Sequence, residues 1–136
     1  MTELFLDPSV LLLAVGGAHP RRADCRGVLA AAAGSQLRIH MSVEGGQEFL
    51  FHRLRMAGRE QAIAEFDAVD GLTIWHEFDV EVLRHSRALV ERGLARGRDA
   101  VHAATAIDAG FAQIVSTDRD FDGIPGLRRV DPKELG

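Results

Sequence analysis

Three aspartates stand where short apolar or small-residue segments of this chain begin or end. Asp7 follows the apolar start of the chain, Asp118 comes soon after Ile114 and Val115, and Asp99 stands at the head of a predicted helix. A carboxylate at the end of a buried segment is poorly solvated, which costs free energy unless it gains a partner. Hard divalent cations prefer oxygen ligands, so a shared Mg²⁺ or Mn²⁺ is the leading candidate for that partner.

Each aspartate also has a purely structural interpretation. Asp7 precedes a proline and Ser9, which is common turn chemistry in which the side chain caps a helix. Asp99 is a residue type favoured at helix starts, where it complements the positive end of the helix. Asp118 and Asp120 belong to a stretch rich in turn formers. Local capping therefore competes with a functional role at every one of these positions.

A fourth acid is expected from a helix predicted to begin after Ser42. Glu44 and Glu48 are four residues apart, so both lie on one helical face, which Phe51 and Arg55 continue. Either glutamate could be the fourth acid of the site, and the other would then belong to a solvated surface of the helix. None of the six histidines shows the paired helical spacing of a zinc site.

Predicted strands and helices alternate along the whole chain. Strands are expected over 4–7, 37–41, 72–75, 113–115 and 128–130. Helices are expected over 9–15, 21–33 and 59–69, after the N-cap residues Ser42 and Asp79, and between Gly97 and Gly110. In the helix over 59–69, Ile63 and Phe66 are predicted to face inward. This alternation predicts an α/β fold with a parallel sheet of four to five strands covered by helices on both faces.

In such sheets the functional crevice lies outside the carboxyl ends of the strands. Asp7 follows the first predicted strand, Asp118 follows the fourth, and Glu48 comes shortly after the second. Carboxylates within about 4 Å of one another repel by a few kcal/mol, so such a cluster takes up protons or a cation. A divalent cation held by oxygens polarises a phosphoryl oxygen and lowers the pKa of an attacking water. Phosphodiester hydrolysis is therefore the expected reaction class.

Length and composition are those of a single domain over residues 1–136. A net charge of −4 argues against coating duplex nucleic acid by charge alone, but not against a nuclease. Fifteen of the sixteen basic residues are arginine, which suits phosphate contact and is equally explained by codon usage in a GC-rich genome. The apolar runs are too short to span a bilayer, and the single Cys25 excludes an internal disulfide. We expect a cytoplasmic protein without membrane contact.

Four segments, in this order, resemble the signature segments of PIN domains, and most closely those of VapC-type toxins from bacterial toxin–antitoxin pairs. They are residues 7–9 (Asp-Pro-Ser), 42–49, 99–106 (Asp-Ala-Val-His-Ala-Ala-Thr-Ala) and 117–121 (Thr-Asp-Arg-Asp-Phe). The resemblance covers nearly the whole chain. It implies a three-layer α/β/α fold with a central, mostly parallel sheet. It also implies a Mg²⁺- or Mn²⁺-dependent endoribonuclease that cleaves single-stranded or loop RNA.

The resemblance also implies which residues form the site. The metal-binding acids would be Asp7, Glu48, Asp99 and Asp118. Auxiliary roles would belong to Asp120, to the hydroxyl residue Thr117, to Ser9 near the first acid, and to Glu44 as the alternative to Glu48. Gly45 and Gly46 depart from the family, which usually has better helix formers there. The likeness further implies a homodimer and a cognate antitoxin whose tail fills the cleft.

Other protein classes remain as alternatives. The main one is a catalytically weak PIN-like module that binds RNA or a partner protein. A phosphatase with an aspartyl nucleophile also places Asp after the first strand, but it needs a second Asp where this chain has Ser9. A phospho-acceptor receiver domain is disfavoured because Asp7 has no matching acidic pair beside it and the expected late lysine is missing.

Overall fold

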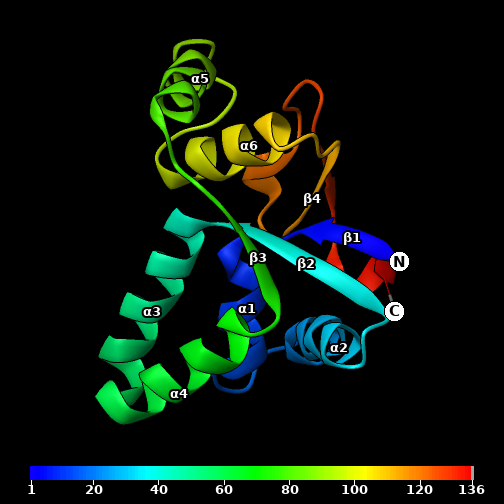
Figure 1. The fold of residues 1–136 in the computed structure, drawn as a ribbon. Helices are drawn as coiled ribbons and strands as arrows, with labels where there is room; N and C mark the ends of the chain where they lie inside the picture. Colours follow the sequence, from blue (N-terminus) through cyan, green and yellow to red (C-terminus); the bar gives the residue numbers. More distant parts are fainter. Residues whose placement is uncertain (136) are drawn as a thin grey trace.

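The computed structural model describes residues 1–135, and its strands form two parallel sheets that meet at one point (Figure 1). The first sheet has the order β1-β2-β3 and the second contains β4 and β5. Their bounds are β1 (Thr2–Phe5), β2 (Leu37–Ser42), β3 (Thr73–His76), β4 (Gln113–Val115) and β5 (Arg128–Val130). A single parallel bridge between Leu6 and Val115 joins the sheets, so the spatial order is β3-β2-β1-β4-β5.

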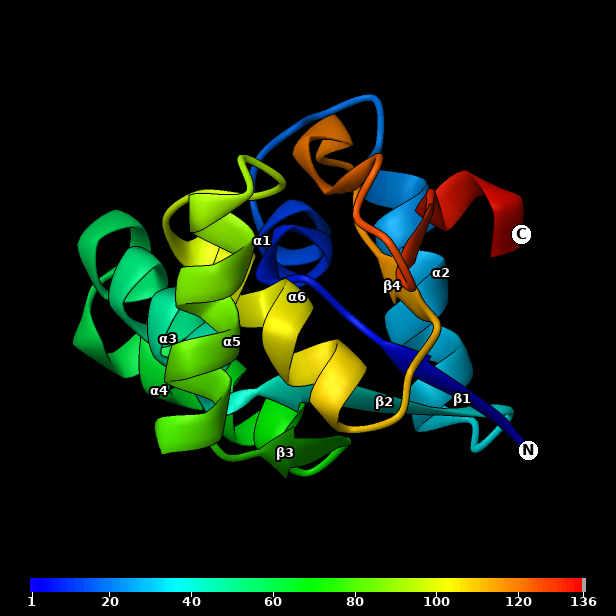
Figure 2. The same cartoon turned by 90° about the horizontal axis from the view of Figure 1, so that it is seen from above.

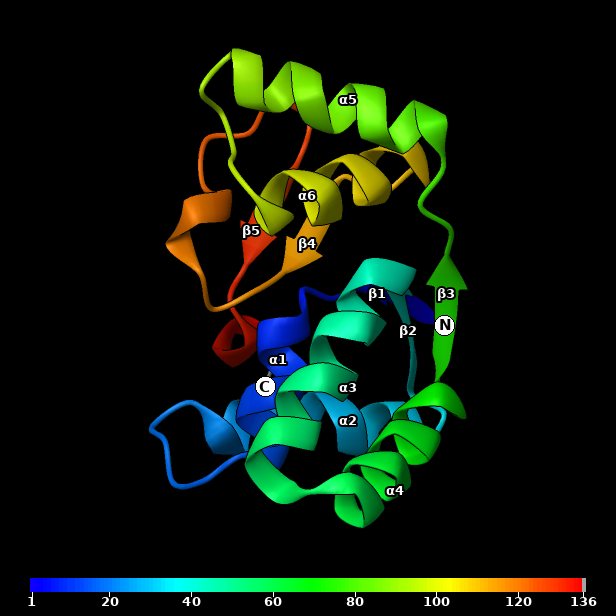
Figure 3. The same cartoon turned by 90° about the vertical axis from the view of Figure 1, so that its left-hand side faces the viewer.

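Helices cover both faces of these strands. On one face lie α1 (Pro8–Val15), α2 (Arg22–Ala33), α3 (Val43–Ala57) and α4 (Arg59–Asp70); on the other lie α5 (Val80–Glu91) and α6 (Arg98–Asp108) (Figures 1 and 3). Two short 3₁₀ turns, η1 (Arg119–Phe121) and η2 (Pro132–Leu135), complete the described chain. The predicted three-layer α/β/α class with parallel strands is confirmed. Within residues 1–135, no helix is both long and apolar enough to cross a membrane.

The prediction of one sheet with four to five strands is too large, because β1 forms a ladder only with β2 and reaches β4 through the single bridge at Leu6. The Leu6 N–H donates to the His40 carbonyl at 2.8 Å, and the next N–H, that of Asp7, donates to the Val115 carbonyl at 2.9 Å. The chain thus pairs with β2 along β1 and reaches β4 only after β1 has ended. The strand order reverses at this point, which is where α/β sheets open a crevice at their carboxyl ends.

Alternating side chains along the strands fill two separate cores. Leu4 and Leu6 pack with the apolar residues of α1 and α2, whereas Phe5 between them packs with those of α5 and α6. The helix α6 lies beside α5 and against β2, and its alanines at the core are fully or almost fully buried (Figure 2). Such small side chains let a helix approach a sheet closely. The first turn of α6 is therefore held near the strand ends.

Three of the helices begin at capping residues that the sequence predicts or allows. The side chain of Asp7 accepts from the Ser9 N–H, that of Ser42 from the Gly45 N–H, and that of Asp79 from the Val82 N–H. The predicted N-caps Ser42 and Asp79 are confirmed. The structural interpretation of Asp7 as a cap is also correct, and it leaves open what else this carboxylate does.

The predicted inward orientation of Ile63 is wrong, since 47% of this residue is exposed. The buried face of α4 instead carries Ala62 and Val69, with Phe66 partly buried between them. Phe66 stacks on Trp75 with the ring planes 11° apart, and this places Ile63 on the outer side of the helix.

Gly45 and Gly46 pack against the sheet instead of merely weakening α3. A Cβ atom on Gly46 would lie 2.7 Å from two atoms of the Trp75 ring, and one on Gly45 would lie 2.9 Å from the Met41 side chain. Both distances are shorter than any ordinary van der Waals contact. The glycine pair therefore lets the first turns of α3 approach β2 and β3.

We predict opposite effects for alanine at two helical glycines. Gly46→Ala should lower the free energy of unfolding by about 1–3 kcal/mol, because Trp75 must move away from its stacking partner and from Asp70, which accepts its indole N–H. Gly27→Ala, in α2, meets nothing within 4 Å and should raise it by roughly 0.5–1 kcal/mol through helix propensity. Urea unfolding of both variants measures this difference. Equal stabilisation by both would contradict the packing role of Gly46.

Candidate metal centre

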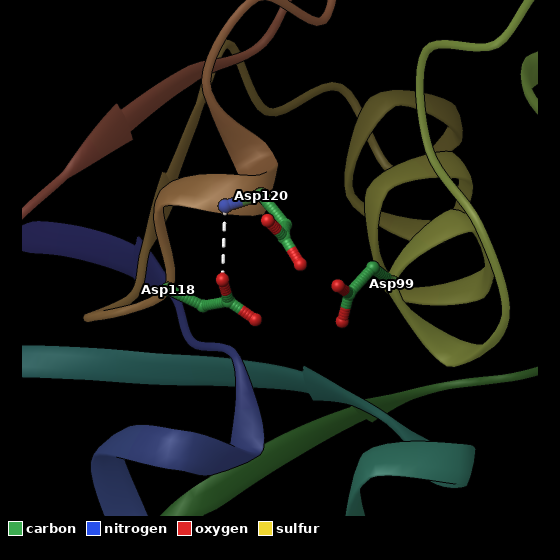
Figure 4. A group of neighbouring side chains, drawn as sticks. All are labelled: Asp99, Asp118 and Asp120. Atoms are coloured by element: carbon green, nitrogen blue, oxygen red, sulfur yellow. Dashed lines mark hydrogen bonds between the residues drawn. The ribbon is translucent and has the colours of Figure 1, made fainter.

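Three carboxylates from two separate parts of the chain converge at the carboxyl ends of the strands. Asp99 comes from the first turn of α6, and Asp118 and Asp120 come from the segment between β4 and the end of η1. Each offers an oxygen atom, and these three atoms lie within 4.8 Å of one another. Figure 4 shows Asp99 facing the two other side chains across a shared gap. The Asp120 N–H donates to Asp118 Oδ1 at 2.9 Å, which fixes the two aspartates relative to each other.

Asp7 lies beside this trio and is linked to it through one serine. Its side chain is 5% exposed, and the Ser116 hydroxyl donates to its Oδ2 at 2.9 Å. The same hydroxyl accepts the Asp118 N–H at 2.9 Å. The Ser9 N–H and the Ser116 hydroxyl both donate to Asp7 Oδ2. Sequence reasoning missed Ser116, although a serine directly after a buried strand is a usable signal.

Burial raises the pKa values of two of these acids, and repulsion by like charges adds to the shift of one of them. The pKa of Asp99 is raised to about 6, first by burial and then by the charges of Asp118 and Asp7. Burial also raises the pKa of Asp7, against the opposing effect of its hydrogen bonds. Both shifts mean that the site disfavours its own negative charge. A bound proton or a cation relieves that repulsion.

Glu48 lies apart from the trio and is held by two side chains of α6. Its Oε2 is 3.2 Å from His102 Nε2, and its Oε1 accepts from Arg98 Nη1 at 3.1 Å. The hydrogen bond with His102 is the main reason why the pKa of Glu48 falls below its usual value, although burial opposes the shift. Of the two alternatives in α3, Glu48 contacts α6, whereas Glu44 lies one turn earlier. Both glutamates line a cavity between α1, α3 and α6.

His102 connects Glu48 to the end of β2. The imidazole is 1% exposed, and its Nδ1 lies 2.9 Å from the Ser42 hydroxyl oxygen. That oxygen accepts the Gly45 N–H, so its own hydrogen can donate to Nδ1. The other ring nitrogen then carries the hydrogen that faces Glu48. His102 is therefore packed and hydrogen-bonded at both ring nitrogens, and its contact orients an acid of the candidate site.

Arg129 in β5 holds the segment that carries two of the trio. Its Nη1 donates to the Ser116 carbonyl at 3.0 Å, and its Nε donates to Asp122 Oδ1 at 2.8 Å. Ser116 and Asp122 stand on either side of Asp118 and Asp120 in the sequence. One guanidinium group therefore fixes both ends of this segment. This role could not be predicted from the sequence, because it depends on how β5 aligns with β4.

The remaining predicted residues also lie at this edge. The Thr117 hydroxyl donates to Ser9 Oγ over 3.4 Å, so the two auxiliary hydroxyl residues contact each other. In the part of the chain that the structure describes, the arginines near the site pair with Glu48 and Asp122 and not with the trio. A set of unpaired carboxylate oxygens fits a hard divalent cation such as Mg²⁺ or Mn²⁺.

Comparisons with known proteins agree with this architecture. A family model described as PIN domain matches residues 4–127. Ribonuclease VapC13 of Mycobacterium tuberculosis is 30% identical over 132 residues, which cover 93% of this chain and 98% of that protein. Ribonuclease VapC7 of the same organism is 30% identical over 141 residues, covering 98% and 94%. The structure of VapBC2 from Rickettsia felis, bound to a DNA fragment from their promoter, has a similar fold, with a TM-score of 0.73, 18% identity and coverage of 96% and 98%.

We predict that Asp99 makes the metal-free protein less stable as the pH rises from about 4 to about 6. In this range the folded chain keeps a proton on Asp99 that the unfolded chain has already lost, because the folded pKa is about 6 against 3.8. Relative to Asp99→Asn, the wild type should lose on the order of 1–2 kcal/mol between pH 4 and pH 7, after allowance for partial exposure. Urea unfolding of both proteins in EDTA measures this loss.

The comparison with Asp99→Asn cancels the pH dependence of the other acids, including Glu48 and Glu65, whose pKa values are lowered. Adding Mn²⁺ at pH 7 should stabilise the wild type more than the variant. A stability difference between the two proteins that does not change with pH would contradict the raised pKa of Asp99.

Proposed function

The chain belongs to the PIN domain family, and we propose that it is a metal-dependent endoribonuclease that acts as the toxin of a toxin–antitoxin pair. The observation that carries this proposal is the trio of aspartates whose oxygens lie within 4.8 Å of one another at the strand ends. The relatives named as VapC ribonucleases match over nearly the whole chain, which supports a nuclease. The presence of Glu48 and of the buried Asp7 near the trio supports the assignment of these acids to a nuclease site of this family.

In this proposal Asp99, Asp118 and Asp120 hold Mg²⁺ or Mn²⁺, and Asp7 adds a carboxylate from the end of β1. When bound, the cation polarises a phosphoryl oxygen and lowers the pKa of a water molecule. Asp7 is positioned for this role by its hydrogen bond from Ser116, and Asp118 by the N–H bond to the same hydroxyl. The protein thus supplies a preorganised set of oxygen ligands.

Glu48 has a different task in the proposed reaction. Its lowered pKa keeps it ionised at neutral pH, so its carboxylate can orient a water molecule by accepting a hydrogen bond. His102 and Arg98 fix the direction of its carboxylate. The proposed substrate is single-stranded or loop RNA, since unpaired bases and backbone are accessible to side chains in a crevice.

Two partners belong to the proposal. The similar fold of VapBC2 from Rickettsia felis supports a cognate antitoxin as the first partner. A homodimer is supported by α5, which exposes Val80, Leu83 and Val90 by 57%, 53% and 50% on its outer side. Exposed apolar residues grouped on one helix are typical of a protein interface.

We predict that loss of either central aspartate abolishes RNA cleavage. Asp99→Asn and Asp118→Asn should each lower the rate on a single-stranded RNA at least about 100-fold, because each removes a ligand charge that the cation requires. Asp67→Asn changes an exposed acid of α4 and should leave the rate unchanged. Gel-based cleavage assays with Mg²⁺, Mn²⁺ or EDTA measure these rates.

Two outcomes would contradict the proposal in different ways. Undiminished cleavage in EDTA would exclude metal dependence. Tight RNA binding without cleavage by the wild type, in either metal, would favour the alternative of a catalytically weak binding module. Thermal melting separates these cases, since a true metal site should be stabilised by Mn²⁺.

We also predict a role for Arg129 in metal affinity. Arg129→Ala frees both ends of the segment that carries Asp118 and Asp120, so the Mn²⁺ concentration for half-maximal cleavage should rise about 10- to 100-fold. Arg128→Ala removes the exposed neighbouring arginine and is the matched control. Isothermal titration with Mn²⁺ gives an independent readout, and equal Mn²⁺ affinities of the two variants would contradict the role of Arg129.

A further inference from the structure

A cavity of about 530 Å³ lies beside the candidate metal centre, between α1, α3 and α6. Glu48 and Arg98 line it, and Arg98 directly precedes Asp99 of the aspartate trio. The first turn of α6 therefore borders both the cavity and the trio. If one phosphate of an RNA strand lies at the trio, a neighbouring nucleotide of that strand can lie at this cavity. Its volume lies within the range of pockets that bind small organic ligands.

The lining of this cavity combines an aromatic ring with guanidinium groups. Phe51 is 47% exposed, and its ring lines the cavity. Arg55 follows one turn later on the same face of α3, and the Arg98 side chain is 76% exposed across the cavity. Gln47 adds an amide group that can both donate and accept hydrogen bonds. Stacking on an aromatic ring next to arginine is a common way of binding single-stranded nucleic acid.

The acids in the lining narrow the class of ligand. Glu44 and Glu48 share the cavity with the two arginines, so its formal charge is close to balanced. A free polyphosphate would be repelled by these carboxylates, whereas one nucleotide within a strand brings a single charge and a large flat base. A second cavity of about 350 Å³, on the Trp75 side of α3, has no charged residue in its lining and offers nothing to a phosphate.

We propose that the cavity beside Glu48 binds one nucleotide of the RNA strand, next to the bond that is cleaved. Its base stacks on Phe51, and its phosphate lies between Arg55 and Arg98. This inference rests on the proposed ribonuclease function and adds a binding subsite to it. Phe51 and Arg55 are positioning residues for the substrate and have no part in holding the cation.

The test measures the affinity of the full-length chain for a fluorescent single-stranded RNA in EDTA, which prevents metal-dependent cleavage. Phe51→Ala should weaken binding about 5- to 150-fold, the range expected for loss of one stacked base, whereas Phe51→Trp should retain it. Arg55→Ala should also weaken binding and reduce the slope of log Kd against log salt by about 0.7, the value for one phosphate contact in a single strand. Fluorescence anisotropy at several salt concentrations gives both quantities.

Two matched variants control for general effects of these changes. Phe78→Ala removes another exposed phenylalanine, outside this cavity, and Arg59→Ala removes an exposed arginine at the start of α4. Both should bind RNA like the wild type. Binding unchanged in Phe51→Ala, or weakened equally in Phe78→Ala, would overturn the proposed subsite. An unaltered salt slope in Arg55→Ala would overturn the phosphate contact.

Kinetics separate this inference from the proposed function. If the chain cleaves RNA, Phe51→Ala should raise KM by a similar factor and leave kcat within about twofold, because the stacked base binds equally in the ground and transition states. If the wild type cleaves no RNA with either metal, the proposed function fails, and the anisotropy data still decide whether the cavity binds RNA. Cleavage with an unchanged KM in Phe51→Ala overturns the subsite alone.

Discussion

Repulsion between carboxylates that the fold keeps within 4.8 Å is the constraint on which the candidate site depends. Two features of the backbone impose it. The end of the first strand bonds both neighbours, with the Leu6 N–H directed to β2 and the Asp7 N–H to β4, which brings Asp7 beside the segment after β4. The buried alanines of α6 let that helix lie close to the strands, and its first turn then delivers Asp99. The pKa of Asp99 rises to about 6, first because the residue is buried there and then because the charges of Asp118 and Asp7 lie close to it.

Three side chains outside the acidic set keep this arrangement in place. The Ser116 hydroxyl links Asp7 to the backbone of Asp118, and Arg129 holds both ends of the same segment. His102 joins the end of β2 to Glu48 through its two ring nitrogens. A site whose acids repel one another in the absence of a cation needs such contacts, since otherwise the loop would relax and separate the charges.

The positions of the main acids follow from sequence because they depend on topology alone. Parallel strands place their carboxyl ends at one edge, so Asp7 and Asp118 could be assigned to a common crevice once the alternating pattern was recognised. The bonds of Ser116 and Arg129 depend instead on side-chain geometry, and Ser116 meets a residue 109 positions away. Pattern and propensity also misjudged Ile63 and Gly46, where the stacking of Phe66 on Trp75 decides which side chain is buried and how close α3 can lie.

The acids at this edge divide into two groups with opposite electrostatic behaviour. Burial raises the pKa values of Asp7 and Asp99, and like charges raise that of Asp99 further, whereas a histidine and an arginine keep Glu48 ionised. A cation is therefore attracted to the aspartates, where it relieves the larger electrostatic cost of ionisation. It would stabilise Glu48 less, because that carboxylate already has two partners. Glu48 and its partner Arg98 are then left facing the cavity that contains Phe51. The fold thus separates a region that requires positive charge from a region whose charge is already balanced, and the second can accept a base and its phosphate without competing for the cation.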